Sequence, residues 1–111
     1  MLVYAPDELP PEPAITAGVT ALRMLADPTR LRLLWLIRDG ESDVGTLAAA
    51  LGAARPAVSQ HLAKLLLAGL VSSRRQGRQV FYRARNGHVR RLVTEAVSAG
   101  GHLVNGEPDH V

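Results

Sequence analysis

Two short helical patterns joined by a tight turn constrain the fold of this chain more than any other feature of its sequence. Apolar residues at helical spacing mark residues 44–51, and a second set continues to about Ala68. The turn Gly52-Ala53-Ala54 separates the two patterns, and Pro56 stands near the start of the second, where a missing N–H is no loss. The segment therefore predicts a helix-turn-helix.

The residues after this pair change from helical to strand-like spacing. Gly69 stops the second helix, and β-prone residues then flank a turn at Gln76-Gly77-Arg78. A glycine-containing turn between two such runs predicts a β-hairpin that ends near Ala84. A basic hairpin that follows a helix-turn-helix is typical of a winged helix-turn-helix.

Further helical patterns lie on both sides of this unit. The first has apolar residues at spacings of three and four, namely Ile15, Val19, Leu22 and Leu25. A second begins at Asp27-Pro28, contains Trp35 as a core residue, and is expected to end at Gly40. The last begins at Asn86 and is expected to stop at Gly100-Gly101. The predicted order is α-α-α-α-β-β-α, a mainly α fold with a β-hairpin wing.

The domain organisation follows from length and composition. A chain of 111 residues with 47% apolar content is long enough for one domain with one core. Four of the seven prolines and three acidic residues fall within residues 1–13, which predicts a disordered N-terminal arm. The domain is assigned to residues 14–100, and residues 101–111 are expected to form a flexible tail.

Charge is distributed unevenly along the sequence. No acidic residue occurs between Asp43 and Glu95, a block of 51 residues that holds nine basic ones. These are Arg55, Lys64, Arg74, Arg75, Arg78, Arg83, Arg85, Arg90 and Arg91. Such a block predicts a polyanionic partner.

Composition excludes several other classes of protein. The sequence has no cysteine, so any metal must be held by nitrogen and oxygen ligands. No apolar run is long enough to span a membrane and the first residues do not read as a secretion signal, which favours a cytoplasmic protein. Ser59-Gln60-His61 suggests a nucleophile and its base, but adjacent helical residues diverge by about 100°, so an enzyme is not expected.

In a winged helix-turn-helix the second helix enters the major groove of DNA, and its first residues face the base edges. Here the candidates for base contact are Arg55, Ala57, Ser59, Gln60 and His61, and for His61 a packing role is an equal alternative. Lys64 is expected to meet phosphate, and Arg74, Arg75 and Arg78 at the hairpin tip are expected to reach the DNA backbone or a minor groove.

Three stretches together resemble the ArsR/SmtB family of bacterial transcription regulators. They are LADPTRLRLLWLIRDGE (residues 25–41), AVSQHLAKLLLAGLV (57–71) and RRQGRQVFYR (74–83). The resemblance implies a homodimer whose first and last helices form the interface and whose affinity for a palindromic operator is altered by an inducer. Ala54 departs from the pattern, because a serine often caps the recognition helix in such proteins.

The stretch FYRARNGHVRRLVTEAV (81–97) is similar to the nickel- and cobalt-responsive members of the family. This resemblance implies metal ligands on the last helix and tail. His88 and His102 stand at two of the four usual positions, whereas Asn86 and Ala99 replace an aspartate and a histidine. Glu107, Asp109 and His110 on the tail are candidates to complete the site. Ni(II) is the expected ion, with Co(II) and Zn(II) as alternatives.

Fourteen residues are 3.9 helical turns, so His88 and His102 would share one face of a helix but lie roughly 21 Å apart. Antiparallel packing of two such helices would place His88 of one chain beside His102 of the other. Two alternatives stay open. The same fold could respond to a small molecule or partner protein instead of a metal, or serve as a protein or RNA interaction module.

Overall fold

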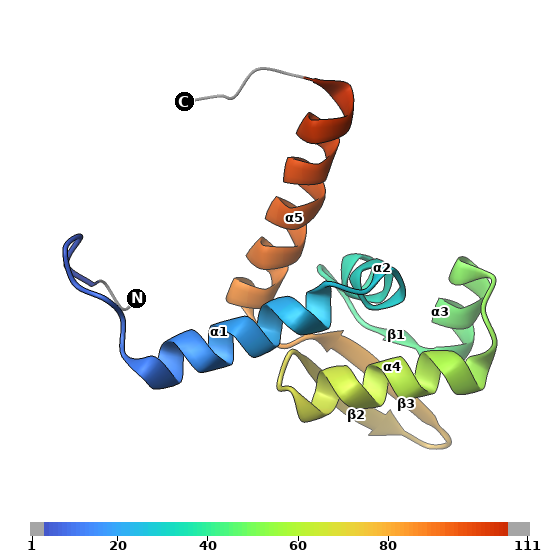
Figure 1. Ribbon diagram of the computed structural model, residues 1–111. Coiled ribbons are helices and arrows are strands. Elements are labelled where there is room, and N and C mark those ends of the chain that lie inside the picture. The colour runs from blue at the N-terminus through green and yellow to red at the C-terminus, as the bar shows by residue number, and fades with distance from the viewer. Residues whose placement is uncertain (1–3, 107–111) are drawn as a thin grey trace.

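The computed structural model describes residues 4–106 and confirms a winged helix-turn-helix. Its helices are α1 (Glu12–Leu25), α2 (Pro28–Leu36), α3 (Val44–Leu51), α4 (Arg55–Leu67) and α5 (Gly87–Asn105). Its strands are β1 (Ser42–Asp43), β2 (Val71–Gln76) and β3 (Gln79–Ala84). In Figure 1, α1 and the C-terminal half of α5 extend away from the rest of the domain.

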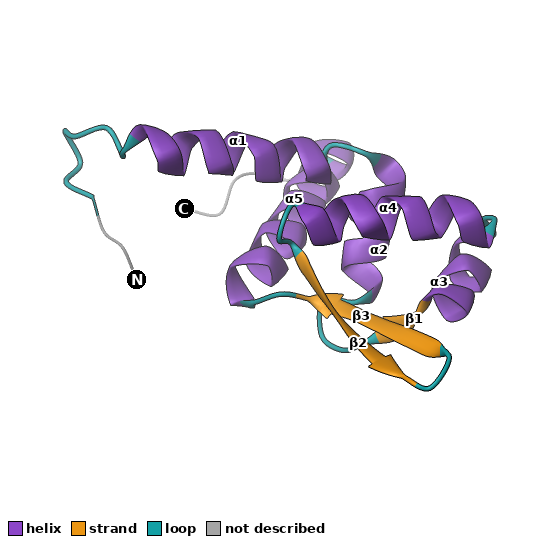
Figure 2. Ribbon diagram, turned by 90° about the horizontal axis from the view of Figure 1, so that it is seen from below, coloured by secondary structure: helices purple, strands orange, loops and turns teal. Residues whose placement is uncertain are grey.

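The predicted hairpin is present, and its turn explains the central glycine. Pairing of Gln76 with Gln79 leaves Gly77-Arg78 as a two-residue loop. Gly77 has a φ of 61°, whereas no non-glycine residue between 4 and 106 has a positive φ, so the loop fits a type II′ turn. Figure 2 shows the hairpin lying along one side of the helices with its tip projecting from the domain.

The sheet contains a third strand that the sequence analysis missed. β1 pairs antiparallel with β3, so that Ser42 lies opposite Tyr82 and Asp43 opposite Phe81, and the sheet order is β1-β3-β2. Two residues are too few to show an alternating pattern, and so this strand is invisible to periodicity. β1 matters because it brings the residues just before the acid-free block next to the wing.

Two predicted helix ends were wrong. α2 ends at Leu36, before Gly40, because the Ile37 carbonyl accepts from the Ala84 N–H at 3.2 Å and the chain turns toward β1. α5 continues through Gly100-Gly101 and ends at Asn105, with Gly106 as its C-cap, since each helical glycine costs only about 1 kcal/mol relative to alanine. α1 begins at Glu12, because a proline in the first helical turn loses no hydrogen bond. α1 therefore includes two residues assigned to the N-terminal arm, and α5 includes residues 101–105 of the assigned tail.

The core is entirely apolar among the described residues. It comprises Leu25, Leu33, Leu34, Ile37, Leu47, Ala48, Val58, Leu62, Leu65, Leu70, Val71, Ala84, Val89 and Val93. Trp35, assigned to the core, is partly buried against it, and the Arg38 guanidinium lies 3.6 Å from the centroid of its ring. Within residues 4–106 no helix has both the length and the apolar character needed to cross a membrane.

Side-chain caps fix where three of the helices begin. Asp27 accepts from the Arg30 N–H at 2.9 Å, Asp43 from Thr46 at 3.0 Å, and Asn86 from Val89 at 3.1 Å. The recognition helix α4 has no such cap, because its N-cap residue is Ala54. The predicted departure at this position therefore leaves the first turn of α4 without a side-chain acceptor.

We expect Asp27→Ala to lower the free energy of unfolding by about 1 kcal/mol, as for other lost N-caps. The hydrogen bond from the Arg30 backbone holds the pKa of Asp27 below its usual value. A carboxyl with a lowered folded pKa stabilises above its unfolded pKa and loses this effect as the pH falls through the folded value. Urea denaturation should therefore show the full difference at neutral pH and a smaller one below about pH 4. A difference that stays constant into acid would contradict this role.

Candidate nucleic-acid interface and metal-ligand residues

Helix α4 has one buried face and one open face. Val58, Leu62 and Leu65, at helical spacing, are fully buried. Five predicted contact residues are exposed on the remaining surface, namely Arg55, Ala57, Ser59, Gln60 and Lys64. The structure therefore presents these side chains to solvent along the length of the helix.

A hollow of about 280 Å³ separates the start of α4 from the wing. Arg55 and Ser59 line it from α4, and Arg78 and Gln79 line it from the hairpin. The structure thus brings together two predicted residues of the helix and one of the wing tip. Gln79 is held in place because its side-chain amide donates to Asp43 Oδ2 at 3.0 Å.

Gly45 is a site residue that the sequence analysis did not identify. A Cβ atom at this position would lie 2.8 Å from Nη2 of Arg55, so a larger residue would displace the guanidinium. Arg55 therefore lies directly over the first turn of α3. The need for a glycine at position 45 follows from the packing of α3 against α4. Nothing in the local sequence distinguishes Gly45 from other glycines.

Arg74 was expected to reach the DNA, but in the structure it is paired with a carboxylate of the same chain. Its guanidinium donates to both carboxylate oxygens of Glu41 and to the Gln76 side chain, and it lies 4.8 Å from the centroid of the Phe81 ring. Hydrogen bonding from Arg74 lowers the pKa of Glu41. Arg74, Arg75 and Arg78 are all exposed, but Arg74 is paired with Glu41, so the three predicted wing cations are not equivalent.

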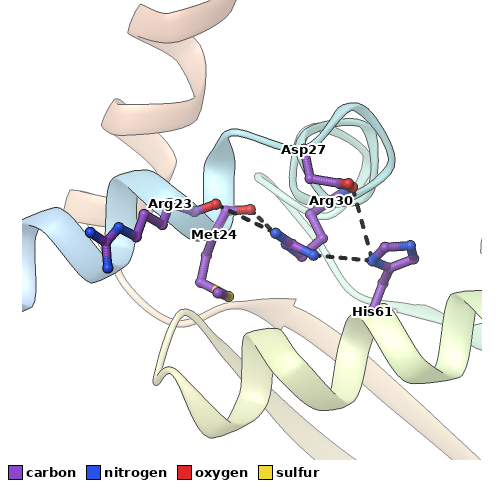
Figure 3. A network of polar contacts seen from close by, with 5 residues as sticks. All are labelled: Arg23, Met24, Asp27, Arg30 and His61. Atoms are coloured by element: carbon purple, nitrogen blue, oxygen red, sulfur yellow. Dashed lines mark hydrogen bonds and ion pairs between the residues drawn. The ribbon is translucent and has the colours of Figure 1, made fainter.

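His61 is turned toward the start of α2. Its Nδ1 lies 3.4 Å from Nη1 of Arg30 and 3.9 Å from Oδ2 of Asp27 (Figure 3). An arginine can only donate, so Nδ1 is the acceptor in the contact with Arg30. Of the two roles weighed for His61, the geometry favours packing within the domain.

Arg30 joins three helices at this junction. Its Nε donates to the Met24 carbonyl at 2.8 Å and its Nη2 to the Arg23 carbonyl at 3.4 Å, both in the last turn of α1. Its Nη1 reaches His61 on α4, as Figure 3 shows. Arg30 therefore satisfies carbonyls that α1 leaves unpaired at its end while contacting the recognition helix.

The two described metal-ligand candidates lie on α5. His88 is exposed, and its Nδ1 lies 3.0 Å from Nη2 of Arg91. His102 lies on the same continuous helix, beyond the glycines that were expected to end it. Glu107, Asp109 and His110 fall outside the described residues. Within residues 4–106 of one chain, no three histidines or carboxylates gather to hold a metal.

A short helix-turn-helix, a three-stranded wing and a basic hollow between them define a winged helix-turn-helix regulator of transcription. Residues 27–73 match the family model described as "Bacterial regulatory protein, arsR family". The chain is 48% identical over 105 residues to the HTH-type transcriptional regulator KmtR of Mycobacterium tuberculosis, covering 95% of this chain and 80% of that protein. The chain belongs to the ArsR family, whose members are regulators and not enzymes.

Two solved structures agree with this assignment. The antimony-specific transcriptional repressor AntR matches with a TM-score of 0.80 at 27% identity, over 95% of this chain and 99% of that one. The homodimeric winged helix-turn-helix DNA-binding domain of Mb0332 from Mycobacterium bovis matches with a TM-score of 0.78 at 26% identity, over 96% and 100%. Both likenesses extend over nearly the whole chain, including α1 and α5.

We expect Arg30→Ala to lower the free energy of unfolding by about 1–3 kcal/mol, because the carbonyls at the end of α1 lose a charged donor. Arg32→Ala is the matched control, since Arg32 is an exposed arginine on the same helix and should change stability by at most about 0.5 kcal/mol. Chemical denaturation measures both variants. Equal stability in the two would show that the junction contributes nothing.

Proposed function

We propose that this chain binds double-stranded DNA as a homodimer in the bacterial cytoplasm, and that a transition metal alters this binding. The observation that carries the DNA-binding proposal is the hollow where Arg55, Ser59 and Arg78 meet. A major groove about 12 Å wide admits one helix, so α4 can enter it while the wing follows the backbone. Arginine and glutamine on the open face of α4 offer bidentate pairs to guanine and adenine.

The homodimer is supported by apolar side chains that the single chain leaves exposed. On α1 these are Ile15, Val19 and Leu22; on α5 they are Leu92, Val97, Leu103 and Val104. Leu103 and Val104 are 84% and 86% exposed, which is unusual for residues of this type in a helix. A second copy covering both helices would bury them and hold two recognition helices about 34 Å apart, on successive turns of a palindromic operator.

We expect Arg78→Ala to weaken binding to every DNA sequence and to reduce the salt slope of the affinity by about 1, as one phosphate contact is lost. Gln60→Ala should instead relax the preference at one base pair, worth about 1–3 kcal/mol. Fluorescence anisotropy with the protein's own upstream DNA and with random DNA, at two salt concentrations, measures both effects.

Arg74→Ala is the matched control for the wing. Because Arg74 is already paired with Glu41, its loss should reduce the salt slope less than the loss of Arg78. If Arg78→Ala and Gln60→Ala reduce specific and random binding equally, the proposed division between backbone and base contacts is wrong. A wild-type protein that does not distinguish its upstream DNA from random DNA would favour an interaction module instead.

The proposed metal site uses His88 and His102 of opposing α5 helices, with Glu107, Asp109 and His110 of the tail as further ligands. Ni(II) suits six nitrogen and oxygen ligands, with Co(II) and Zn(II) as alternatives. At His88, Nη2 of Arg91 already lies 3.0 Å from Nδ1. A metal bound there through Nδ1 must displace Arg91, so metal binding would change contacts on α5. The antimony-specific relative AntR supports an inorganic effector.

Calorimetric titration of Ni(II), Co(II) and Zn(II) tests this site. The double variant His88→Ala/His102→Ala should lose binding, and the affinities of wild-type protein identify the preferred ion. His61→Ala is the control, since this histidine is held within the domain by Arg30. Equal metal affinity in wild type and double variant would remove the proposed site.

A second candidate function keeps DNA binding but replaces the metal with a small apolar molecule. A mostly apolar hollow of about 280 Å³ lies between α2, α3 and α5, lined by Leu31, Arg32, Trp35, Leu36, Ala50, Leu51 and Val97. Its size falls just below the usual range of ligand pockets, about 300–1,000 Å³. Absence of any metal response, with DNA binding retained, would favour this candidate.

A further inference from the structure

The DNA-facing residues use only part of the acid-free basic block. Four of its nine cations are not among the proposed DNA contacts, namely Arg83, Arg85, Arg90 and Arg91. Three of these four line one hollow of about 150 Å³ together with Arg38, which comes from the loop after α2. The turn between Ala84 and Gly87 completes the lining. Side chains from three separate parts of the sequence thus meet at the start of α5.

Backbone hydrogen bonds fix the position of this arginine hollow. The Ala84 N–H donates to the Ile37 carbonyl at 3.2 Å, and the Arg85 N–H donates to the Leu70 carbonyl at 3.0 Å. These bonds hold the end of β3 beside the loop that carries Arg38. Arg38 is itself held, since its Nη1 donates to the Trp35 carbonyl at 2.7 Å and its guanidinium stacks on the Trp35 ring.

The arginine hollow carries more positive charge than its nearest carboxylate balances. Asp39 lies 3.4 Å from Nε of Arg38 and 3.6 Å from Nη1 of Arg90, but it does not line the hollow and its side chain is 63% exposed. Both distances exceed the roughly 2.7–2.9 Å of a charge-assisted hydrogen bond. Glu41, the next carboxylate along the chain, is held by Arg74. Asp39 and Glu41 therefore balance the four guanidinium groups only in part, because Glu41 faces Arg83 but is hydrogen-bonded to Arg74. An anion would stabilise such an arrangement.

We propose that the arginine hollow binds a small, free oxyanion of the phosphate class. A guanidinium presents its donors in a planar fork that matches two oxygens of a phosphate, and it stays charged at any physiological pH. The volume of about 150 Å³ is well above the roughly 10–15 Å³ that a single water molecule needs, so the hollow has room for a small anion. The bound anion would connect β3 of the wing to α5.

A free anion fits better than the DNA backbone because of where the arginine hollow lies. β3 begins at Gln79, beside the wing tip, and ends at Ala84, beside the hollow. Five residue steps of a strand separate the two by roughly 17 Å. The hollow also contains none of the residues proposed for base contact or for metal, so its occupancy is independent of both proposals.

Titration of inorganic phosphate into the full-length protein, in chloride buffer without DNA or metal, tests the proposal. We expect saturable binding with one site per chain. Arg85→Gln and Arg90→Gln should each weaken it by at least about tenfold, as expected for loss of a hydrogen bond to a charged group. Arg23→Gln is the matched control, because it removes the same charge from an exposed position on α1. Circular dichroism melting checks that the variants fold.

Two results would overturn the proposal. One is the absence of saturable phosphate binding, or an equal loss in Arg23→Gln, which would indicate general attraction to a basic protein. The other is a DNA result in phosphate-free buffer. If Arg85→Gln reduces DNA affinity and its salt slope as much as Arg78→Gln, these arginines contact the DNA backbone and not a free anion. A smaller effect of Arg85→Gln on DNA supports the proposal.

Discussion

The orientation of the recognition helix depends on three buried side chains. Val58, Leu62 and Leu65 are completely buried, so the rest of α4 must face solvent. Burying a side chain of this size contributes about 1.5–3 kcal/mol, whereas an exposed ion pair such as Arg74–Glu41 is screened by solvent and contributes far less. The apolar core therefore decides which residues of α4 are available to a partner, and the polar contacts around it adjust individual side chains.

Arg30 shows how the extended helix α1 is connected to this arrangement. α1 packs on the core mainly through its C-terminal end, where Leu25 is buried, while Ile15, Val19 and Leu22 are exposed. The carbonyls of Met24 and Arg23 and the ring of His61 all contact the same guanidinium (Figure 3). The side chain of Arg30 therefore directly connects the C-terminal end of α1 to the middle of the recognition helix α4.

Most helices and the hairpin could be predicted from sequence, because their signals are local. Asp27, Asn86 and Gly77 each specify a cap or a turn within four residues. The errors concern features set by distant residues. β1 and the early end of α2 depend on pairing with β3, some 40 residues away. α5 continues through two glycines because the helix propensities of all its 19 residues together decide where it ends, and not those of the glycines alone.

The basic block contains no acidic residue in the sequence, but in the folded chain carboxylates from outside the block lie beside it. The three carboxylates nearest before the block lie in β1 and in the loop that precedes it, and the fold brings all three back to the block. Asp43 accepts from Gln79, Glu41 pairs with Arg74, and Asp39 lies beside Arg90. The block is therefore acid-free in sequence but not in space. Pairing divides its arginines into those held within the domain and those open to a partner, and the register of a two-residue strand determines that division.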